Sequence, residues 1–198
     1  MKNKARGDLN FDMARFYTTR KKPLSHSIYE EDNYMDTSTS PNKPPASLAL
    51  DSLGIEHRVF IHEKPVSSFE EAASHRNQRP GQIVRSILFQ IRDGEFLMVL
   101  MAGPSQIDWK SLRQLVKRSR IRMATEKEVL EVTGYRIGTV SPFGVKNQVQ
   151  VLIDASVLKE DEISIGSGVR NMAIIMQSAD LRRVFESSAV VSLAVAGT

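Results

Sequence analysis

The sequence of 198 residues contains no cysteine, so disulfides, thiolate metal sites and cysteine nucleophiles are excluded. Long apolar runs are missing as well. The longest stretches without a charged residue have 12 residues each, Phe96–Ile107 and Ser187–Thr198. A membrane-spanning helix needs roughly 20 apolar residues. No apolar segment of the secretory type opens the chain, so we expect a cytoplasmic protein with no membrane partner.

Motifs for metals and common cofactors are also missing. The sequence has four histidines, of which His57 and His62 fall on opposite faces of a predicted strand and the other two lie elsewhere. We therefore expect the histidines to form no site, and predict no metal centre. There is no Gly-x-Ser-x-Gly nucleophile motif, no phosphate-binding loop and no dinucleotide fingerprint. The expectation is a protein without a cofactor.

Positive charge is concentrated in one segment. The net charge is only +4, but between Ser105 and Arg122 a single acid, Asp108, stands against six cations: Lys110, Arg113, Lys117, Arg118, Arg120 and Arg122. At 100° per residue, Lys110, Arg113 and Lys117 share one face of a predicted helix. Such an excess suits a polyanion such as nucleic acid, and a solvated helix face is the alternative.

Composition divides the chain in two. Residues 1–46 mix charges with Ser, Thr, Asn and Pro and are predicted to be a disordered extension, whereas residues 47–198 have the dense apolar pattern of one domain. A protein-interaction scaffold that uses this extension is a further, less favoured hypothesis for the function.

The domain is predicted to combine hairpins and helices. Capping boxes at Ser67/Glu70 and Thr125/Glu128 open two of the helices, and Asp93-Gly94 joins two strands as a hairpin. The expected helices are a short one before Gly54, 68–77, 108–118, one from Thr125 to Gly134, and 179–185; the expected strands are 56–62, 83–92, 95–102, 148–154, 162–165 and 172–177, with a last apolar run at 190–195. Without regular β-α-β alternation, this order indicates an α+β or mixed-sheet domain.

Arg85 is the most informative single residue. In the strand Ile83–Ile91 it shares a face with Ile83, Ile87, Phe89 and Ile91, which should pack inward. A charge on that face is costly unless it is paired or opens into a polar cavity. The functional interpretation is a guanidinium that holds an anionic or carbonyl group. The alternatives are a structural ion pair and a strand end that turns the side chain to water.

A loop with two glycines and a proline, Gly138-Thr139-Val140-Ser141-Pro142-Phe143-Gly144, is the second candidate. Glycine lets the main chain approach a ligand, and successive N–H groups can hold an oxyanion or an ester carbonyl. An ordinary turn is the alternative. The turn Gly166-Ser167-Gly168 is expected to be a β-turn and not a ligand loop.

Taken in order, several segments resemble the YbaK/EbsC family, which includes freestanding aminoacyl-tRNA deacylases and the editing domain of bacterial prolyl-tRNA synthetases. The resemblance covers about Ser47–Phe185, and its marks are "SSFEEAA", "IVRSILFQ", "FLMVLMAGPSQIDWKSL", "TGYRIGTVSPFG", "VLIDASVL" and "IGSG". It implies a mixed α/β domain, with a curved, largely antiparallel sheet flanked by helices. It also implies hydrolysis of the ester of mischarged aminoacyl-tRNA without metal or organic cofactor.

The resemblance further implies roles for single residues. The Gly-x-x-x-Pro element falls on Gly138–Pro142, and Arg85 stands where the family usually has lysine. Expected catalytic residues are Arg85, Gly138, Ser141 and Pro142; expected substrate-binding residues are Thr139, Val140, Phe143 and Gly144; expected tRNA contacts are Lys110, Arg113 and Lys117. Aminoacyl-tRNA is the implied partner, with an aminoacyl-tRNA synthetase as a second candidate. The competing hypothesis is a module that binds the aminoacyl-tRNA end without hydrolysing it, because arginine cannot accept a proton near neutral pH.

Overall fold

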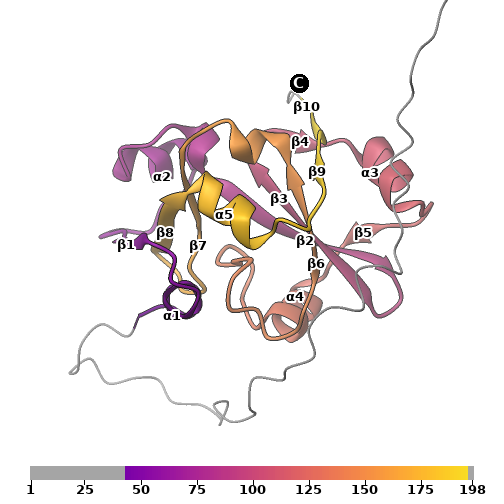
Figure 1. Cartoon of the computed structure of the whole chain (residues 1–198), viewed down its shortest axis with the longest axis horizontal. Helices are drawn as coiled ribbons and strands as arrows, with labels where there is room; N and C mark the ends of the chain where they lie inside the picture. The colour runs from indigo at the N-terminus through magenta and orange to yellow at the C-terminus, as the bar shows by residue number, and fades with distance from the viewer. Residues whose placement is uncertain (1–42, 196–198) are drawn as a thin grey trace, which may run out of the picture. The chain divides into compact units, whose positions relative to one another are not determined.

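The computed structural model describes residues 43–195, which form two connected layers of strands surrounded by helices (Figure 1). The predicted disordered extension lies outside the described residues, apart from its last four. Of these, Pro45 and Ala46 already belong to the first helix. The helices are α1 (Pro45–Ser52), α2 (Phe69–His75), α3 (Trp109–Val116), α4 (Glu126–Thr133) and α5 (Ser178–Val184), with short 3-10 helices η2 (Pro80–Gln82) and η3 (Ala155–Leu158).

The strands form three hydrogen-bonded groups. The largest has the order β5-β2-β3-β6-β9, the second β1-β8-β7, and the third pairs β10 with β4. Their bounds are β1 (His57–Ile61), β2 (Val84–Arg92), β3 (Glu95–Ala102), β4 (Gln106–Ile107), β5 (Arg122–Met123), β6 (Gln150–Asp154), β7 (Glu162–Gly166), β8 (Met172–Gln177), β9 (Val190–Val191) and β10 (Ala194–Val195). Among the strand pairs of residues 43–195, β3–β6 and β6–β9 are parallel and the others are antiparallel. The largely antiparallel mixed sheet that the sequence predicts is therefore confirmed.

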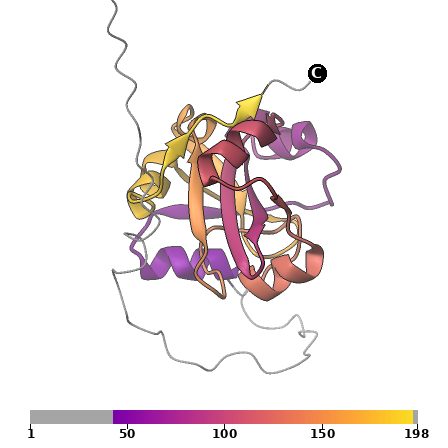
Figure 2. The same ribbon diagram turned by 90° about the vertical axis from the view of Figure 1, so that its right-hand side faces the viewer.

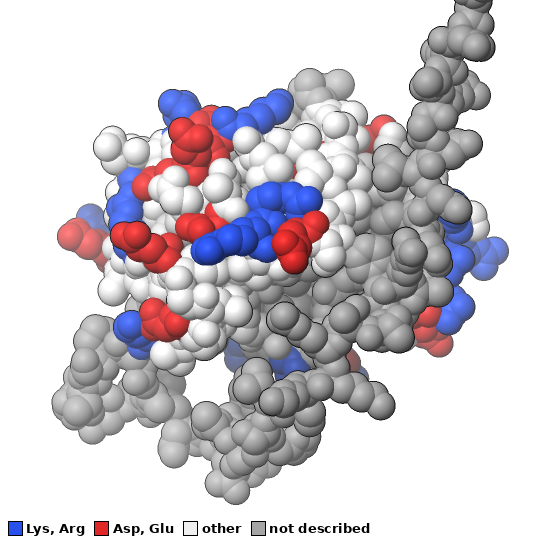
Figure 3. All heavy atoms as spheres, in the orientation of Figure 1, with Lys and Arg blue, Asp and Glu red and all other residues white. Residues whose placement is uncertain are grey.

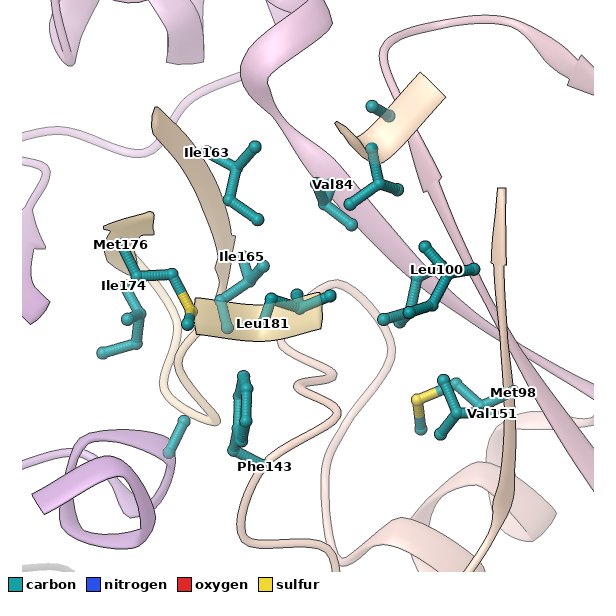
Figure 4. Close-up of a cluster of buried hydrophobic side chains, with 14 of the residues drawn as sticks. Val84, Met98, Leu100, Phe143, Val151, Ile163, Ile165, Ile174, Met176 and Leu181 are labelled. Carbon is teal, nitrogen blue, oxygen red and sulfur yellow. The ribbon is translucent and has the colours of Figure 1, made fainter. Parts of the chain in front are cut away.

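A single parallel bridge between Ile83 and Ser164 joins β2 to β7 and so connects the two larger groups of strands. The main hydrophobic core lies against one face of these two groups of strands. Val84 from β2 and Ile163 and Ile165 from β7 point into it, together with Leu100 and Leu181 (Figure 4). Because side chains alternate along a strand, Ile83, Arg85, Ser164 and Gly166 lie on the opposite, outer face.

The outer face is partly covered by helices. The Phe89 ring of β2 meets Trp109 of α3 edge-on at 5.4 Å between centroids. Leu112 of α3 is fully buried. Figure 2 shows the central strands lying side by side, with helices around them. On the face that carries Arg85, Phe89 and Ile91 are buried, whereas Arg85 and Ile87 are only half-buried. The expectation that this face packs against the core is therefore corrected, because the main core lies on the opposite face of β2, with Val84 and Leu88.

Local signals place most element boundaries well. Gly94 takes a φ of 70° in the β2–β3 hairpin, and Gly134 one of 77° at the end of α4. The box Thr125/Glu128 caps α4 as predicted. The capping box expected at Ser67/Glu70 is wrong by one residue: Ser68 accepts from the backbone of Glu71, and Ser67 donates to the Glu71 carboxylate.

No helix within residues 43–195 is long and apolar enough to cross a membrane.

Candidate functional site

Arg85 lies near the start of β2 on the outer face, where its side chain is half-buried. Its guanidinium donates to the backbone carbonyl of Ser105 and stacks over the Phe69 ring, 5.6 Å from the centroid. Within residues 43–195 no carboxylate pairs with Arg85, and its buried Nε has no hydrogen-bond partner. The structural ion pair and the exposed strand end are both excluded for this part of the chain.

Burial lowers the pKa of Arg85 from its usual value. The cause is desolvation, since water that would stabilise the cation is replaced by Phe69 and the strand floor. A half-buried guanidinium without a counter-charge still offers donors for a carbonyl or phosphate oxygen.

The loop 138–144 is held in place by its own backbone and by the β7–β8 turn. Gly138 opens the loop with a φ of 87°, and Thr139 donates its N–H and its hydroxyl to the carbonyl of Arg136. The Thr139 carbonyl accepts from Gly168 at 2.9 Å. Gly166 must lack a side chain, because a Cβ there would lie 2.2 Å from the Val140 carbonyl oxygen.

Four of the loop residues expected to act on the substrate are buried. Thr139 and Ser141 are at most 4% exposed, Pro142 is buried, and the Ser141 hydroxyl accepts from the backbone of Phe143. Phe143 lies in the main core, 5.4 Å from the Phe185 ring (Figure 4). Apolar packing and loop hydrogen bonds thus occupy the side chains of Thr139, Ser141 and Phe143, so we expect these residues to meet a substrate through their backbone.

The backbone N–H groups are the part of the loop that can bind a ligand. The N–H groups of Val140 and Ser141 donate to no partner within the described residues. Gly138 is exposed, and a Cβ there would meet nothing within 4 Å. Gly144 is exposed too, but its backbone carbonyl accepts from the Tyr135 hydroxyl. An approach through backbone N–H groups is what the sequence predicts for this loop.

Strand register brings the cation and the loop to neighbouring positions. Counting two residues on from the Ile83–Ser164 bridge leads to Arg85 on β2 and Gly166 on β7, both on the outer face. Since the Val140 carbonyl lies over Gly166, the loop and Arg85 lie on the same face where β2 and β7 adjoin. No hydrogen bond joins the Arg85 side chain to residues 138–144.

A second buried cation, which the sequence analysis missed, lies on the same face. Arg76, just after α2, donates to Ser164 Oγ at 2.9 Å and to Nε2 of His62 at 2.9 and 3.1 Å. Nδ1 of His62 lies 3.3 Å from Nδ1 of His75. Burial lowers the pKa of Arg76 to about 10. His62 and His75, 13 residues apart in the chain, are thus in contact, which the sequence did not predict.

Helix α3 carries the predicted cations on its surface, but it is shorter than predicted. Lys110, Arg113 and Lys117 are all exposed, and Arg113 stacks over Trp109 at 5.7 Å. The helix is shorter than the predicted 108–118, because Asp108 caps its start and Lys117 turns left-handed with a φ of 52°. Figure 3 shows Lys and Arg side chains at the right-hand edge, on the side where α3 and β5 lie in Figure 1.

A cavity of about 460 Å³ lies away from Arg85 and the loop. It is lined by the end of the β2–β3 hairpin, Gln90–Asp93, and by the segment Arg118–Arg122. No motif in the sequence predicted it, because its two walls come from segments 25 or more residues apart.

Fold and site together define a small α/β domain in which a cation without an ion-pair partner in residues 43–195 and a glycine-rich backbone loop lie on the same outer face, where two groups of strands adjoin. Residues 63–184 match the family described as the aminoacyl-tRNA editing domain. The match covers more than half of the sequence, and the chain belongs to this family.

Relatives agree with this assignment. The uncharacterized protein YwhH of Bacillus subtilis is 31% identical over 64% of this chain and 80% of its own length. The multifunctional Ser/Thr-tRNA deacylase ProXp-y of Escherichia coli is 24% identical over 71% of this chain and 86% of its own length. Proline–tRNA ligases match as well, the one from Aquifex aeolicus with 26% identity over 61% of this chain, but the chain spans only about a fifth of that ligase.

Among solved structures, a crystal structure of a candidate trans-editing enzyme for prolyl tRNA synthetase superposes with a TM-score of 0.71 and 26% identity. The alignment covers 80% of this chain and 99% of that one. The editing-domain fold that the resemblance implied is therefore confirmed.

Proposed function

We propose that this aminoacyl-tRNA editing protein hydrolyses, in trans, the ester that joins a mischarged amino acid to the 3′ end of tRNA. The observation that supports the proposal is that Arg85 and loop 138–144 share the outer face where β2 and β7 adjoin. The free-standing relatives of similar length, such as the Ser/Thr-tRNA deacylase ProXp-y, support action in trans.

The backbone loop is suited to the charge that develops in this reaction. Water attacks the ester carbonyl carbon, and the carbonyl oxygen becomes an oxyanion. The N–H groups of Val140 and Ser141, which have no partner within the described residues, would donate to it. The bond from the carbonyl carbon to the ribose 3′-oxygen then breaks. The water's proton passes to that oxygen, and amino acid and tRNA leave.

Arg85 would anchor the substrate and not act as a base. Guanidinium stays charged near neutral pH and has no lone pair for a proton. Its fork can hold two oxygens, such as the ester carbonyl or the terminal phosphate. Phe69 and the carbonyl of Ser105 fix the plane of the fork. The exposed Lys110, Arg113 and Lys117 would contact tRNA phosphates, which adds affinity without reading sequence.

The test is hydrolysis of a panel of mischarged tRNAs by the purified protein and by Arg85→Ala. We expect release of at least one amino acid by the natural protein and a loss of roughly 100-fold or more in the variant, the scale of one lost oxyanion contact. Lys159→Ala, which removes a cation that is exposed, is the control and should keep full activity. Absence of hydrolysis with every mischarged tRNA would refute the proposal.

The second candidate function is binding of the aminoacyl-tRNA end without hydrolysis. It is favoured by one observation, the arginine at the position where the family usually has lysine. Arg85→Lys separates the two functions, because the smaller ammonium restores the family's residue. A large gain of hydrolysis over an inactive natural protein would assign the binding function, whereas activity in the natural protein assigns the deacylase.

A further inference from the structure

The cavity at the far end of β2 is rich in arginine, which supplies four of its nine lining residues. Its lining includes Arg92, Arg118, Arg120 and Arg122, against one acid, Asp93. Two of these cations are already paired: Arg92 with Glu95 at 2.6 Å and Arg122 with Glu128 at 2.7 Å. The other two, Arg118 and Arg120, form no ion pair with any residue of 43–195.

Arg118 also has an unused donor. Its Nε is buried and has no hydrogen-bond partner within the described residues. A buried polar atom without a partner loses its hydrogen bonds to water and gains none in the protein, which lowers the free energy of unfolding by about 1–3 kcal/mol. Such an atom on a cavity wall therefore points to a ligand that accepts hydrogen bonds.

Backbone geometry explains why the hollow forms. β5 pairs with β2 at Phe89–Met123 and Gln90–Arg122, and the pairing stops there. The β2–β3 register shifts between Gln90 and Arg92, which marks a bulge. The segment before β5 leaves α3 through the left-handed Lys117, so it runs apart from the bulged hairpin. The cavity therefore lies between the bulged end of the β2–β3 hairpin and the segment that leads into β5.

The cavity lies on the path from the proposed ester site. Arg85 and Arg92 are seven residues apart on the same strand, about 23 Å at 3.3 Å per residue. Helix α3, with its exposed cations, packs on the same face between them through Trp109 and Phe89. At about 3.4 Å per stacked nucleotide, 23 Å corresponds to roughly seven nucleotides. RNA whose 3′ end lies at Arg85 would therefore bring phosphates of its paired stem to the cavity.

We propose that this cavity binds the phosphate backbone of the tRNA acceptor stem through Arg118 and Arg120. The inference rests on the proposed function, since the ester site sets where the RNA begins. Phosphate is the acceptor that matches unpaired guanidinium donors, and a volume of about 460 Å³ exceeds what a single small anion fills. The site positions the tRNA and takes no part in the chemistry.

Binding of uncharged tRNA tests the inference without any need for hydrolysis. The full-length protein is compared with Arg118→Gln/Arg120→Gln, with Arg120→Gln alone, and with Lys159→Gln as the matched control for loss of one exposed cation. We expect the double variant to bind roughly tenfold more weakly. Its slope of log K against log salt should be shallower by about 0.9 for each lost phosphate contact. Arg120 is exposed, so the single variant remains informative if the double variant unfolds.

Hydrolysis provides a second, independent comparison. With full-length mischarged tRNA, the KM of the double variant should rise about tenfold while kcat is unchanged. With an aminoacylated four-nucleotide oligomer, about 14 Å long when stacked, KM should not change, because the oligomer cannot reach the cavity. If the natural protein hydrolyses neither substrate, the proposed function fails, and the binding assay still decides the inference.

Three results would overturn the inference. The first is tRNA binding by the double variant that equals the natural protein's at every salt concentration. The second is an equal rise in KM for the full tRNA and the short oligomer. The third is displacement of tRNA by adenosine monophosphate or inorganic phosphate at micromolar concentration, which would assign the cavity to a small phosphorylated ligand.

Discussion

At the scale of single residues, the site depends on a missing side chain as much as on charges. Gly166 leaves room for the Thr139 and Val140 carbonyls over β7, and these carbonyls fix where the loop's N–H groups lie relative to Arg85. The atoms that a Cβ would strike are backbone, which cannot move aside as a flexible side chain can. The loop's position is therefore set by strand β7.

We predict that Gly166→Ala displaces the loop. The added methyl should lower the free energy of unfolding by about 1–3 kcal/mol, as overpacking does, and should greatly reduce deacylation. Gly81→Ala is the matched control, because its Cβ would meet only Glu160 Oε1 at 3.8 Å. Chemical denaturation and the deacylation assay measure both effects, and equal behaviour of the two variants would contradict the prediction.

A second residue-scale prediction concerns His62. Burial lowers its pKa, and Arg76 and His75 lower it further, while Glu71 opposes them. A lowered folded-state pKa means that the folded protein favours neutral His62. Stability should therefore be complete above the unfolded value of about 6.5 and fall as the pH drops below it.

Denaturation of the natural protein and of His62→Gln between pH 7 and pH 5 measures this effect. Glutamine keeps an acceptor for Arg76 but does not titrate. The natural protein should lose more stability than the variant over this range. Carboxylates such as Glu71 titrate below it, since hydrogen bonds from Ser67 lower the Glu71 pKa. If the stability of the two proteins fell equally between pH 7 and pH 5, protonation of His62 would not be the cause of the loss.

At the scale of elements, helix α4 and strand β5 are fixed together by one carboxylate. Glu128 accepts from the backbone and the hydroxyl of Thr125 at 2.8 and 2.9 Å and pairs with both terminal nitrogens of Arg122 at 2.7 Å. The hydrogen bonds from Arg122, followed by the Thr125 backbone, lower the pKa of Glu128 to about 2. This contribution to stability is present above pH 4.5 and declines as the pH falls toward 2.

Removal of the cap should therefore weaken the element without changing the site. We expect Thr125→Ala to lower the free energy of unfolding by about 1 kcal/mol, the usual value of an N-cap. Ser187→Ala, an exposed serine for which the structure gives no hydrogen bond, is the control and should be neutral. Thermal denaturation checks the difference, and an unchanged melting temperature in Thr125→Ala would contradict it.

At the scale of the whole molecule, the two larger groups of strands share one core although a single bridge joins them. Val84 comes from one group and Ile165 from the other, and both are almost fully buried (Figure 4). A shared core makes the two groups unfold together. The site benefits, because Arg85 and Gly166 belong to different groups and need a fixed junction.

Ile165→Ala tests this cooperation. The cavity left in the core should lower the free energy of unfolding by about 2–5 kcal/mol, with one transition seen by both tryptophan fluorescence and circular dichroism. Ile61→Ala on β1, where the side chain is 53% exposed, is the control and should have a small effect. Two separate transitions in Ile165→Ala would show that the two groups of strands fold independently.

Sequence patterns predicted the elements well where a local rule governs them. The Asp93-Gly94 hairpin, the Thr125/Glu128 cap and the glycine at the end of α4 each depend on neighbouring residues only. The two-residue strands β4 and β5 were missed, because so short a strand has no periodicity and exists only through its partner.

By itself, the sequence determined the fold class, the cation at Arg85 on an apolar strand face and the glycine-rich loop, because strand alternation and glycine geometry are local properties of the chain. Only the tertiary structure decided that Arg85 and the loop share one face at the β2–β7 junction, that Thr139, Ser141 and Phe143 are buried, and that His62, His75 and Arg76 touch. Such contacts join residues far apart in the chain. They depend on register and packing, which no local pattern of residues encodes.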